Sequence, residues 1–250
     1  MKFEGAFLVT LLAGLANAAP GTEFRRRRAE SGHKLINHVQ GPTNTTEVSY
    51  SSNWAGAVLV GTGYTSVTAT FTVPTPKSAG SGSAWVGIDG DTCGTAILQT
   101  GIDWTKSGSS ITYDAWYEWY PNYAYDFSTL TISEGDSVTV TVTASSKTAG
   151  KAKIKNNTTG KTVTHSFSNE ASEGSLCEYN AEWIVEDFEE GSSLVSFADF
   201  GSVVFTSASA TQSGSTVGIT GAQIIDIEQS SKVLTDASIT SSSQLTVTYV

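Results

Sequence analysis

The sequence predicts an all-β protein folded as a sandwich, and three observations support this prediction. Short runs of β-branched and aromatic residues recur between clusters of Gly, Asn, Ser and Asp. No stretch shows the long apolar repeat of 3.6 residues that marks an amphipathic helix. In the run 137–143, residues 138–143 alternate strictly between valine and threonine, as a strand with one buried face does. Many short strands at near-regular spacing are typical of antiparallel sandwiches.

The predicted strands follow one another through most of the chain. Within 137–143 we expect Val138, Val140 and Val142 to form the buried face, because successive side chains point to opposite sides of a sheet. The other runs are bounded by turn residues, which end strands. Examples are residues 54–60, 66–73, 84–88, 111–120, 137–143, 151–155, 161–167, 202–206, 222–227 and 244–249, and the segment 181–188 is also interpreted as a strand.

Residues 1–18 have the form of a secretory signal peptide. Lys2 precedes an apolar run over residues 6–16, and Ala16-Asn17-Ala18 matches the small-x-small cleavage pattern. The alternative is a signal-anchor helix, but the apolar run is too short to span a bilayer. We therefore expect a secreted, extracellular protein.

Residues 19–48, with an approximate boundary, are predicted to be a basic pro-segment that precedes a folded body at 49–250. All four arginines of the chain form one run over residues 25–28. This run is interpreted as a processing site or as a group that docks on the body and inhibits it until the pH falls; a solvated linker is the alternative. Glycosylation sequons begin at Asn44, Asn156 and Asn157.

The body is strongly acidic and contains two cysteines. From Ser49 onward there are 20 acidic residues and 8 lysines, a formal charge of −12. Such a surface repels nucleic acid and anionic membranes, so we expect neither as a partner. It suits work at low pH, although solubility explains it equally well. In a secreted chain an even pair such as Cys93 and Cys177 typically forms a disulfide, with a free thiol as the alternative.

Several chemistries lack the residues that they need. His165 is the only histidine of the body, and no Gly-x-Ser-x-Gly elbow accompanies it. The chain has no His-Glu-x-x-His motif and no glycine-rich phosphate loop before a helix. We therefore expect no metal site and no cofactor. Carboxylates, amides and aromatic rings remain as the groups that could act.

Glu186 is the strongest candidate for a catalytic group. If residues 181–188 form a strand, Glu182, Ile184, Glu186 and Phe188 share one face. A carboxyl group between apolar neighbours is partly desolvated, which disfavours its charged form and makes it a candidate acid or base.

Two further segments carry polar groups among aromatic residues. One reads AWVGIDGDTCGTAILQTG and ends near Gln99, and the other reads YDAWYEWYP. Together they predict a cleft lined by rings and carboxylates, in which a carboxyl group could act as base and an amide could donate to an oxyanion. Ordinary sandwich core is the alternative for the aromatic stretch.

The ordered motifs SNWAG, AWVGIDGDTC, TAILQTG, YDAWYEWYP, FSNE and NAEWIVEDFEE resemble those of the glutamic peptidases, the eqolisin family of secreted acid endopeptidases from filamentous fungi. The resemblance covers the body from Asn53 to Val250. It implies a sandwich of two curved antiparallel sheets, a monomer, protein and peptide substrates, and a pro-segment that inhibits the enzyme.

By motif, the resemblance assigns the family's catalytic glutamine and glutamate to Gln99 and Glu186. It implies a disulfide between Cys93 and Cys177. The cleft-lining, substrate-binding positions that it implies are Trp54, Trp85, Asp89, Asp114, Trp116 and Glu118. Asp89 is expected to orient the catalytic pair by hydrogen bonding.

The resulting hypothesis is peptide hydrolysis at acid pH, with Glu186 activating a water and Gln99 stabilising the oxyanion. Two other functions remain open at this point. A β-sandwich glycoside hydrolase could use Glu118 and Glu186 as its paired carboxyls. A lectin-like module could bind glycans on the same aromatic residues without catalysis.

Overall fold

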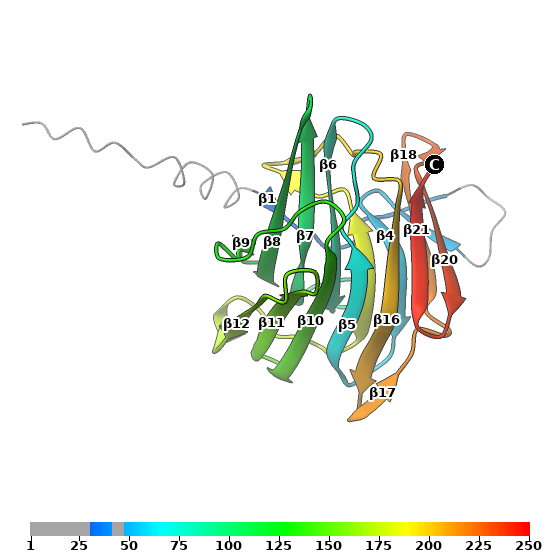
Figure 1. Ribbon diagram of the computed structural model, residues 1–250. Helices are drawn as coiled ribbons and strands as arrows, with labels where there is room; N and C mark the ends of the chain where they lie inside the picture. The colour runs from blue at the N-terminus through cyan, green and yellow to red at the C-terminus, as the bar shows by residue number, and fades with distance from the viewer. Residues whose placement is uncertain (1–30, 42–47) are drawn as a thin grey trace, which may run out of the picture.

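The computed structural model describes residues 31–41 and 48–250, and it is an antiparallel β-sandwich (Figure 1). The first sheet has the order β2-β3-β18-β4-β13-β6-β7-β8-β9, with β19 beside β18. The second has the order β12-β11-β10-β5-β16-β21-β20, with β17 beside β16. All strand pairs within them are antiparallel except β3 with β18. The predicted fold class is therefore confirmed.

The strands of the first sheet are β2 (His38–Val39), β3 (Val48–Ser51), β4 (Trp54–Val60), β6 (Gly80–Ile88), β7 (Ile97–Ser107), β8 (Ser110–Tyr120), β9 (Tyr125–Asp126), β13 (Asn180–Glu186), β18 (Gln223–Gln229) and β19 (Lys232–Val233). Those of the second are β5 (Tyr64–Thr72), β10 (Ser137–Ser146), β11 (Ala149–Asn156), β12 (Thr162–Phe167), β16 (Ser202–Gln212), β17 (Ser215–Val217), β20 (Thr235–Ser241) and β21 (Gln244–Tyr249). A small third sheet joins β1 (Ser31–Gly32), β14 (Glu189–Glu190) and β15 (Ser193–Leu194), and one 3₁₀ turn covers Glu170–Ser172.

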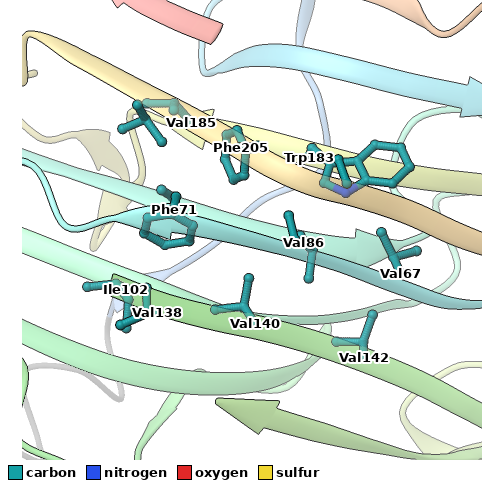
Figure 2. Close-up of a cluster of buried hydrophobic side chains, with 14 of the residues drawn as sticks. Val67, Phe71, Val86, Ile102, Val138, Val140, Val142, Trp183, Val185 and Phe205 are labelled. Atoms are coloured by element: carbon teal, nitrogen blue, oxygen red, sulfur yellow. The ribbon is translucent and has the colours of Figure 1, made fainter. Parts of the chain in front are cut away.

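The core lies between the two large sheets, and the valine face of β10 forms part of it (Figure 2). Val138, Val140 and Val142 are completely buried, as their alternation with threonine predicts. They lie near Trp183 and Val185 of the facing sheet in the same cluster. Each buried valine contributes roughly 1.5–3 kcal/mol relative to an exposed one. The intervening threonines point outward and bond across strands, as Thr139 Oγ1 does with Thr70 Oγ1 at 2.7 Å.

Strand β7 is the main element that the sequence pattern did not predict. Its first eight residues, Ile97 to Trp104, are all buried, so both of its faces are covered. Alternation of apolar and polar residues indicates only strands with one solvent-exposed face, and this alternation is absent here. The strand at Thr235–Ser241 was also missed. It has one exposed face, but its inner face carries Thr235 and Ala237 before Ile239, so the apolar alternation is weak.

The predicted pro-segment contributes strands of its own, although its sequence shows no strand periodicity. Residues 31–41, which we call the leader segment, contain β1 and β2. Strand β1 pairs with β14, and β2 pairs with β3 at the edge of the first sheet. The predicted signal peptide, the arginine run and the sequon at Asn44 lie outside the described residues. In the described part of the chain, no helix has the length and apolar character needed to cross a bilayer.

Candidate active site

The candidate site lies on the outer face of the first sheet, around the central strand β13. Trp183 and Val185 of this strand point into the core between the sheets. Alternation therefore places Glu182, Ile184 and Glu186 on the opposite face, as predicted. The strand ends at Glu186, so Phe188 follows it instead of continuing it.

Three rows of side chains cross this face over strands β13, β6, β7 and β8. The first row runs through Glu186, Ser83, Asp103 and Asp114; the second through Ile184, Trp85, Gly101 and Trp116; the third through Glu182, Gly87, Gln99 and Glu118. Trp54 of β4 begins the first row beside Glu186. The register thus brings predicted site residues from five separate motifs onto one face.

Two glycines make room for Trp85 and the strand that carries it. A Cβ atom on Gly101 would lie 2.4 Å from the Ala84 carbonyl oxygen and 2.5 Å from the Cβ of Trp85. A Cβ atom on Gly87 would lie 2.8 Å from the Cζ3 of Trp85. All three distances are shorter than real contacts. Gly101 therefore lets β7 approach the backbone of β6 at Trp85, and Gly87 leaves space for the indole ring.

The predicted tryptophans Trp54, Trp85 and Trp116 belong to one buried apolar cluster on this face. The rings of Trp54 and Trp85 meet edge to face at 4.8 Å, a favourable aromatic geometry. The indole N–H groups of Trp54 and Trp116 are buried without a hydrogen-bond partner among the described residues. Two donors are therefore available on an apolar floor.

The carboxyl group of Glu186 is completely buried and is held by three donors. Trp85 donates from Nε1 to Oε2 at 2.8 Å. The ring of His33 bonds from Nδ1 to the same oxygen at 2.8 Å, and the Lys34 backbone N–H donates to Oε1 at 3.1 Å. Two of the three donors therefore come from the leader segment.

Gln99 is completely buried and donates from Nε2 to Oε2 of Glu118 at 3.0 Å. Burial raises the pKa of Glu118 to about 8; His33 opposes this rise, and the negative charge of Glu186 adds to it. Glu118 therefore interacts electrostatically with Glu186. The amide of Gln99 joins this group of charges through its hydrogen bond to Glu118. The Oε1 atom of Gln99 has no hydrogen-bond partner among the described residues.

Glu182, the neighbour most easily confused with Glu186, lies in a different environment. Burial raises its pKa well above the ordinary value, and the charges of Asp89 and Asp91 raise it further. Asp89 and Asp91, the two charges that act on Glu182, lie near the disulfide. The charge of Glu186 acts on Glu118 instead. The two glutamates of β13 are thus electrostatically separate.

Asp89 has a different set of partners from those that the sequence suggested. Its carboxyl group accepts four backbone N–H bonds from residues 177–180, at 2.7–3.2 Å. Burial raises its pKa, although these four donors act to lower it. The side chain thus fixes the loop after Cys177 and does not orient the pair Gln99 and Glu186 through these bonds. Asp114 lies at the far end of the first row, opposite Asp103.

The predicted disulfide between Cys93 and Cys177 is present and joins positions 84 residues apart. It lies beside Asp89, whose carboxyl group binds the backbone of Cys177 at 2.7 Å. The covalent bond and these hydrogen bonds together attach the chain before β13 to the end of β6.

The leader segment lies in the site, and its contribution was not predicted residue by residue. The ring of His33 stacks on Trp116 at 3.7 Å, and its Nε2 lies 3.6 Å from Asp103. Burial acts to lower the pKa of His33, but the charges of Glu186 and Asp103 and the bond to Glu186 raise it to about 9. The ring is therefore a buried cation between carboxylates.

The rest of the leader segment is bonded to the body. Leu35 and Ile36 pack against the tryptophan cluster. The Leu35 carbonyl accepts from Nδ2 of Asn53 at 3.1 Å, and the Asn37 N–H donates to Oδ1 of Asn53 at 2.9 Å. His38, half-exposed, bonds Asp91 at 2.8 Å. The sequence signal for this contact is His33-Lys34-Leu35-Ile36, a basic pair before an apolar pair.

A sandwich whose outer sheet face gathers a buried carboxylate, an amide bonded to a second carboxyl and three indoles has the groups of a hydrolase active site. A family model described as the Peptidase A4 family matches residues 52–249. The chain therefore belongs to this family, the glutamic peptidases or eqolisins, and it is a peptide-bond hydrolase.

Individual relatives agree with this assignment. The chain is 53% identical to aspergillopepsin-2 of Aspergillus niger, over all of both chains. It is 48% identical to scytalidopepsin B of Scytalidium lignicola, over 96% of each chain. A crystal structure of scytalido-glutamic peptidase with a transition state analog inhibitor superposes with a TM-score of 0.75 at 50% identity, covering 80% of this chain and 98% of that one. Family membership favours a peptidase over the glycoside hydrolase and lectin alternatives.

Proposed function

We propose that the chain is the precursor of a secreted, monomeric acid endopeptidase in which Glu186 activates a water and Gln99 stabilises the oxyanion. The observation that carries this proposal is the set of partners of Glu186. Within the body, Trp85 is its only hydrogen-bond donor among the described residues, and the other two donors come from the leader segment. Removal of that segment leaves a carboxylate with one fixed oxygen and one oxygen open to a water.

The catalytic step follows from the properties of these groups. Glu186 as a carboxylate takes a proton from water, and the oxygen of that water attacks the scissile carbonyl carbon. The Gln99 amide donates to the oxyanion that forms. Glu186 then returns the proton to the leaving nitrogen, which completes hydrolysis without a covalent enzyme intermediate. The indole N–H groups of Trp54 and Trp116 would bind substrate carbonyls on the apolar floor.

Substitution of the two catalytic candidates tests this proposal. With the processed protein and a denatured protein substrate at about pH 3–4, Glu186→Gln should lower kcat by about 10²- to 10⁴-fold, the usual contribution of a general base. Gln99→Met has similar length but no N–H donor, and should lower kcat by about 10²- to 10³-fold. Circular dichroism checks that each variant is folded.

Glu182→Gln is the matched control, because it changes a buried carboxyl of the same strand outside the charged cluster. It should retain hydrolysis. Full activity in Glu186→Gln would contradict the assignment. If Glu182→Gln were inactive in the same assay, the catalytic carboxyl would be Glu182 instead. Hydrolysis should also survive an inhibitor of pepsin-type aspartic peptidases, because its groups are a carboxyl and an amide instead of two aspartates.

The leader segment acts in this proposal as the inhibitor within the precursor. The imidazole of His33 is bonded to the Glu186 carboxyl group that the catalytic water would contact. Leu35 and Ile36 cover the tryptophan cluster. A synthetic peptide of residues 31–41 should therefore inhibit the processed enzyme competitively. His33→Ala leaves Glu186 and Asp103 buried without their cation, which typically costs about 3–5 kcal/mol, or more than about 100-fold in inhibition constant.

The exposed His38 provides the control for this second test. Its pair with Asp91 lies near the surface, where such pairs contribute about 0–1 kcal/mol, so His38→Ala should change inhibition by less than about tenfold. The folded pKa of His33, about 9, lies above its ordinary value of 6.5. Its contribution to binding should therefore be complete below pH 6.5 and be lost as the pH rises through 9. Equal inhibition by the wild-type and His33→Ala peptides would exclude this role.

Secretion and processing have their own support and their own test. The pattern of residues 1–18 and the likeness to fungal acid peptidases support export, followed by removal of residues 19–48. Amino-terminal sequencing of the protein recovered from a fungal culture medium should give a start near residue 49. A start at residue 19 in the active enzyme would contradict removal of the leader segment, and size-exclusion chromatography would test the monomer.

A further inference from the structure

Two overlapping glycosylation sequons begin at the end of strand β11 in the second sheet, the first at its last residue, Asn156. They are Asn156-Asn157-Thr158 and Asn157-Thr158-Thr159, so either asparagine could accept a glycan according to the sequence. The turn that they form lies between β11 and β12, far in the sequence from the residues of the candidate site. The environments of the two amides differ completely.

Asn156 lies inside the protein with no exposed surface. Its Nδ2 donates to Oδ2 of Asp136 at 2.7 Å and to the carbonyl of Thr131 at 3.4 Å. Its Oδ1 accepts from the backbone N–H of Thr159 at 3.1 Å. Both amide hydrogens and the carbonyl are therefore in use. A sugar on this nitrogen would break the bonds and force a hydrated group into the interior, which the folded state does not tolerate.

Asn157 is exposed and is the first residue of the turn. Its Nδ2 donates to Oγ1 of Thr139 at 2.9 Å and weakly to Oγ of Ser137 at 3.4 Å. A glycosylated amide keeps one hydrogen, so the shorter bond to Thr139 can remain. Only the long contact to Ser137 has to be given up.

The position of Thr139 shows where a glycan would lie. Its neighbours Val138 and Val140 point into the core, so Thr139 lies on the outer face of the second sheet. The candidate active site lies on the outer face of the first sheet. A glycan attached to Asn157 therefore grows away from the site, on the opposite side of the sandwich.

We propose that Asn157, and not Asn156, carries an N-linked glycan in the folded, exported protein. This inference rests on the proposed entry into the secretory route. In the transfer, Nδ2 of Asn157 attacks the anomeric carbon of an oligosaccharide carried on a lipid diphosphate. The bond from that carbon to the phosphate oxygen breaks as the bond to nitrogen forms. The lipid diphosphate leaves, and the amide loses one proton.

Two threonine substitutions separate the overlapping sequons. Thr159→Ala destroys only the sequon of Asn157. Thr158→Ala destroys only the sequon of Asn156, because position 158 is the unrestricted middle position of the sequon that begins at Asn157. Both threonines are exposed. The full chain is expressed in a fungal host, once with its own first 18 residues and once with a signal peptide of the host. The second version enters the secretory route whatever residues 1–18 do.

The secreted proteins are treated with a glycosidase in ¹⁸O-water, which labels each formerly glycosylated asparagine, and the peptide containing both asparagines is read by mass spectrometry. The wild type and Thr158→Ala should be labelled at Asn157, and Thr159→Ala should carry no label in this peptide. All three should hydrolyse substrate at the same rate after processing. A label on Asn156, or an unlabelled Asn157 while a glycoprotein of the host is labelled, overturns the proposal. Export of only the host-signal version contradicts the proposed signal peptide instead.

Discussion

At the scale of single residues, the protein treats its buried carboxyl groups in different ways. Asp89 receives four backbone N–H donors, and Glu186 receives three donors, of which one is a cation. Glu118 receives one amide donor, and its other oxygen has no partner among the described residues. A buried carboxyl group with few donors keeps its proton to a higher pH. Glu118 is such a group, and we expect it to be neutral at acid pH.

Glu118 should therefore be replaceable by its neutral isostere. Its folded pKa of about 8 lies above the ordinary 4.5, so the stability that it contributes is complete below pH 4.5 and is lost as the pH rises through 8. Glu118→Gln removes this loss, and should raise the free energy of unfolding near pH 8 by a few kcal/mol, at about 1.4 kcal/mol per pKa unit.

Urea unfolding of both proteins at pH 4 and pH 8 measures this effect. At pH 4 the two curves should differ little, because the wild-type side chain is protonated in both states. A stabilisation of equal size at both pH values would show that packing, and not protonation, is responsible.

At the scale of elements, the alternation in β10 and β13 was predicted from the sequence because each strand has two chemically different faces. Strand β7 was not, because both of its faces are covered over residues 97–104. The site shows the same contrast. Glu186 and the tryptophans stand out in their motifs, whereas the need for Gly87 and Gly101 depends on the placement of Trp85 on neighbouring strands.

The disulfide is an element-scale constraint whose removal has a calculable effect. The double variant Cys93→Ser, Cys177→Ser frees a loop of 84 residues in the unfolded chain. Chain-entropy models then predict a loss of about 4.5 kcal/mol in the free energy of unfolding. Denaturant unfolding of the processed protein measures it. In a reducing buffer the wild type should lose the same stability, so that the two curves coincide; a persistent difference would point to packing of the sulfur atoms.

At the scale of the whole molecule, the two outer faces of the sandwich have separate properties. The first sheet carries buried carboxyls, indoles and the leader segment, and the second carries exposed threonines and the Asn157 turn. The general fold and the site motifs could be predicted from local patterns. The position of His33 beside Glu186 could not be predicted in this way. It depends on how residues 31–41 and Glu186 approach each other in space, which no periodicity in the sequence encodes.

Several buried carboxyls together predict that the fold is most stable at acid pH. Burial raises the pKa of Asp226 to about 6, of Asp187 to about 7 and of Glu118 to about 8. Each contributes stability that is complete below its ordinary pKa near 4 and is lost as the pH rises through the folded value. The Tm should therefore be highest near pH 4 and fall from there to pH 8, most steeply below pH 6, where all three groups lose stability together. Calorimetry over this range measures it, and a maximum at neutral pH would contradict the raised values.

The leader segment is covalently continuous with the body, and this connection has a consequence for how the precursor would be activated. A ligand joined to its receptor by a short stretch of chain acts at an effective concentration on the order of millimolar. Even a peptide with a Kd of about 1 μM then occupies its site almost completely. One cut between the segment and the body turns the same contact into an encounter between two molecules. In a dilute medium the freed peptide would then be lost by dilution alone. Under the proposed function, activation would be irreversible without any change in the contacts themselves.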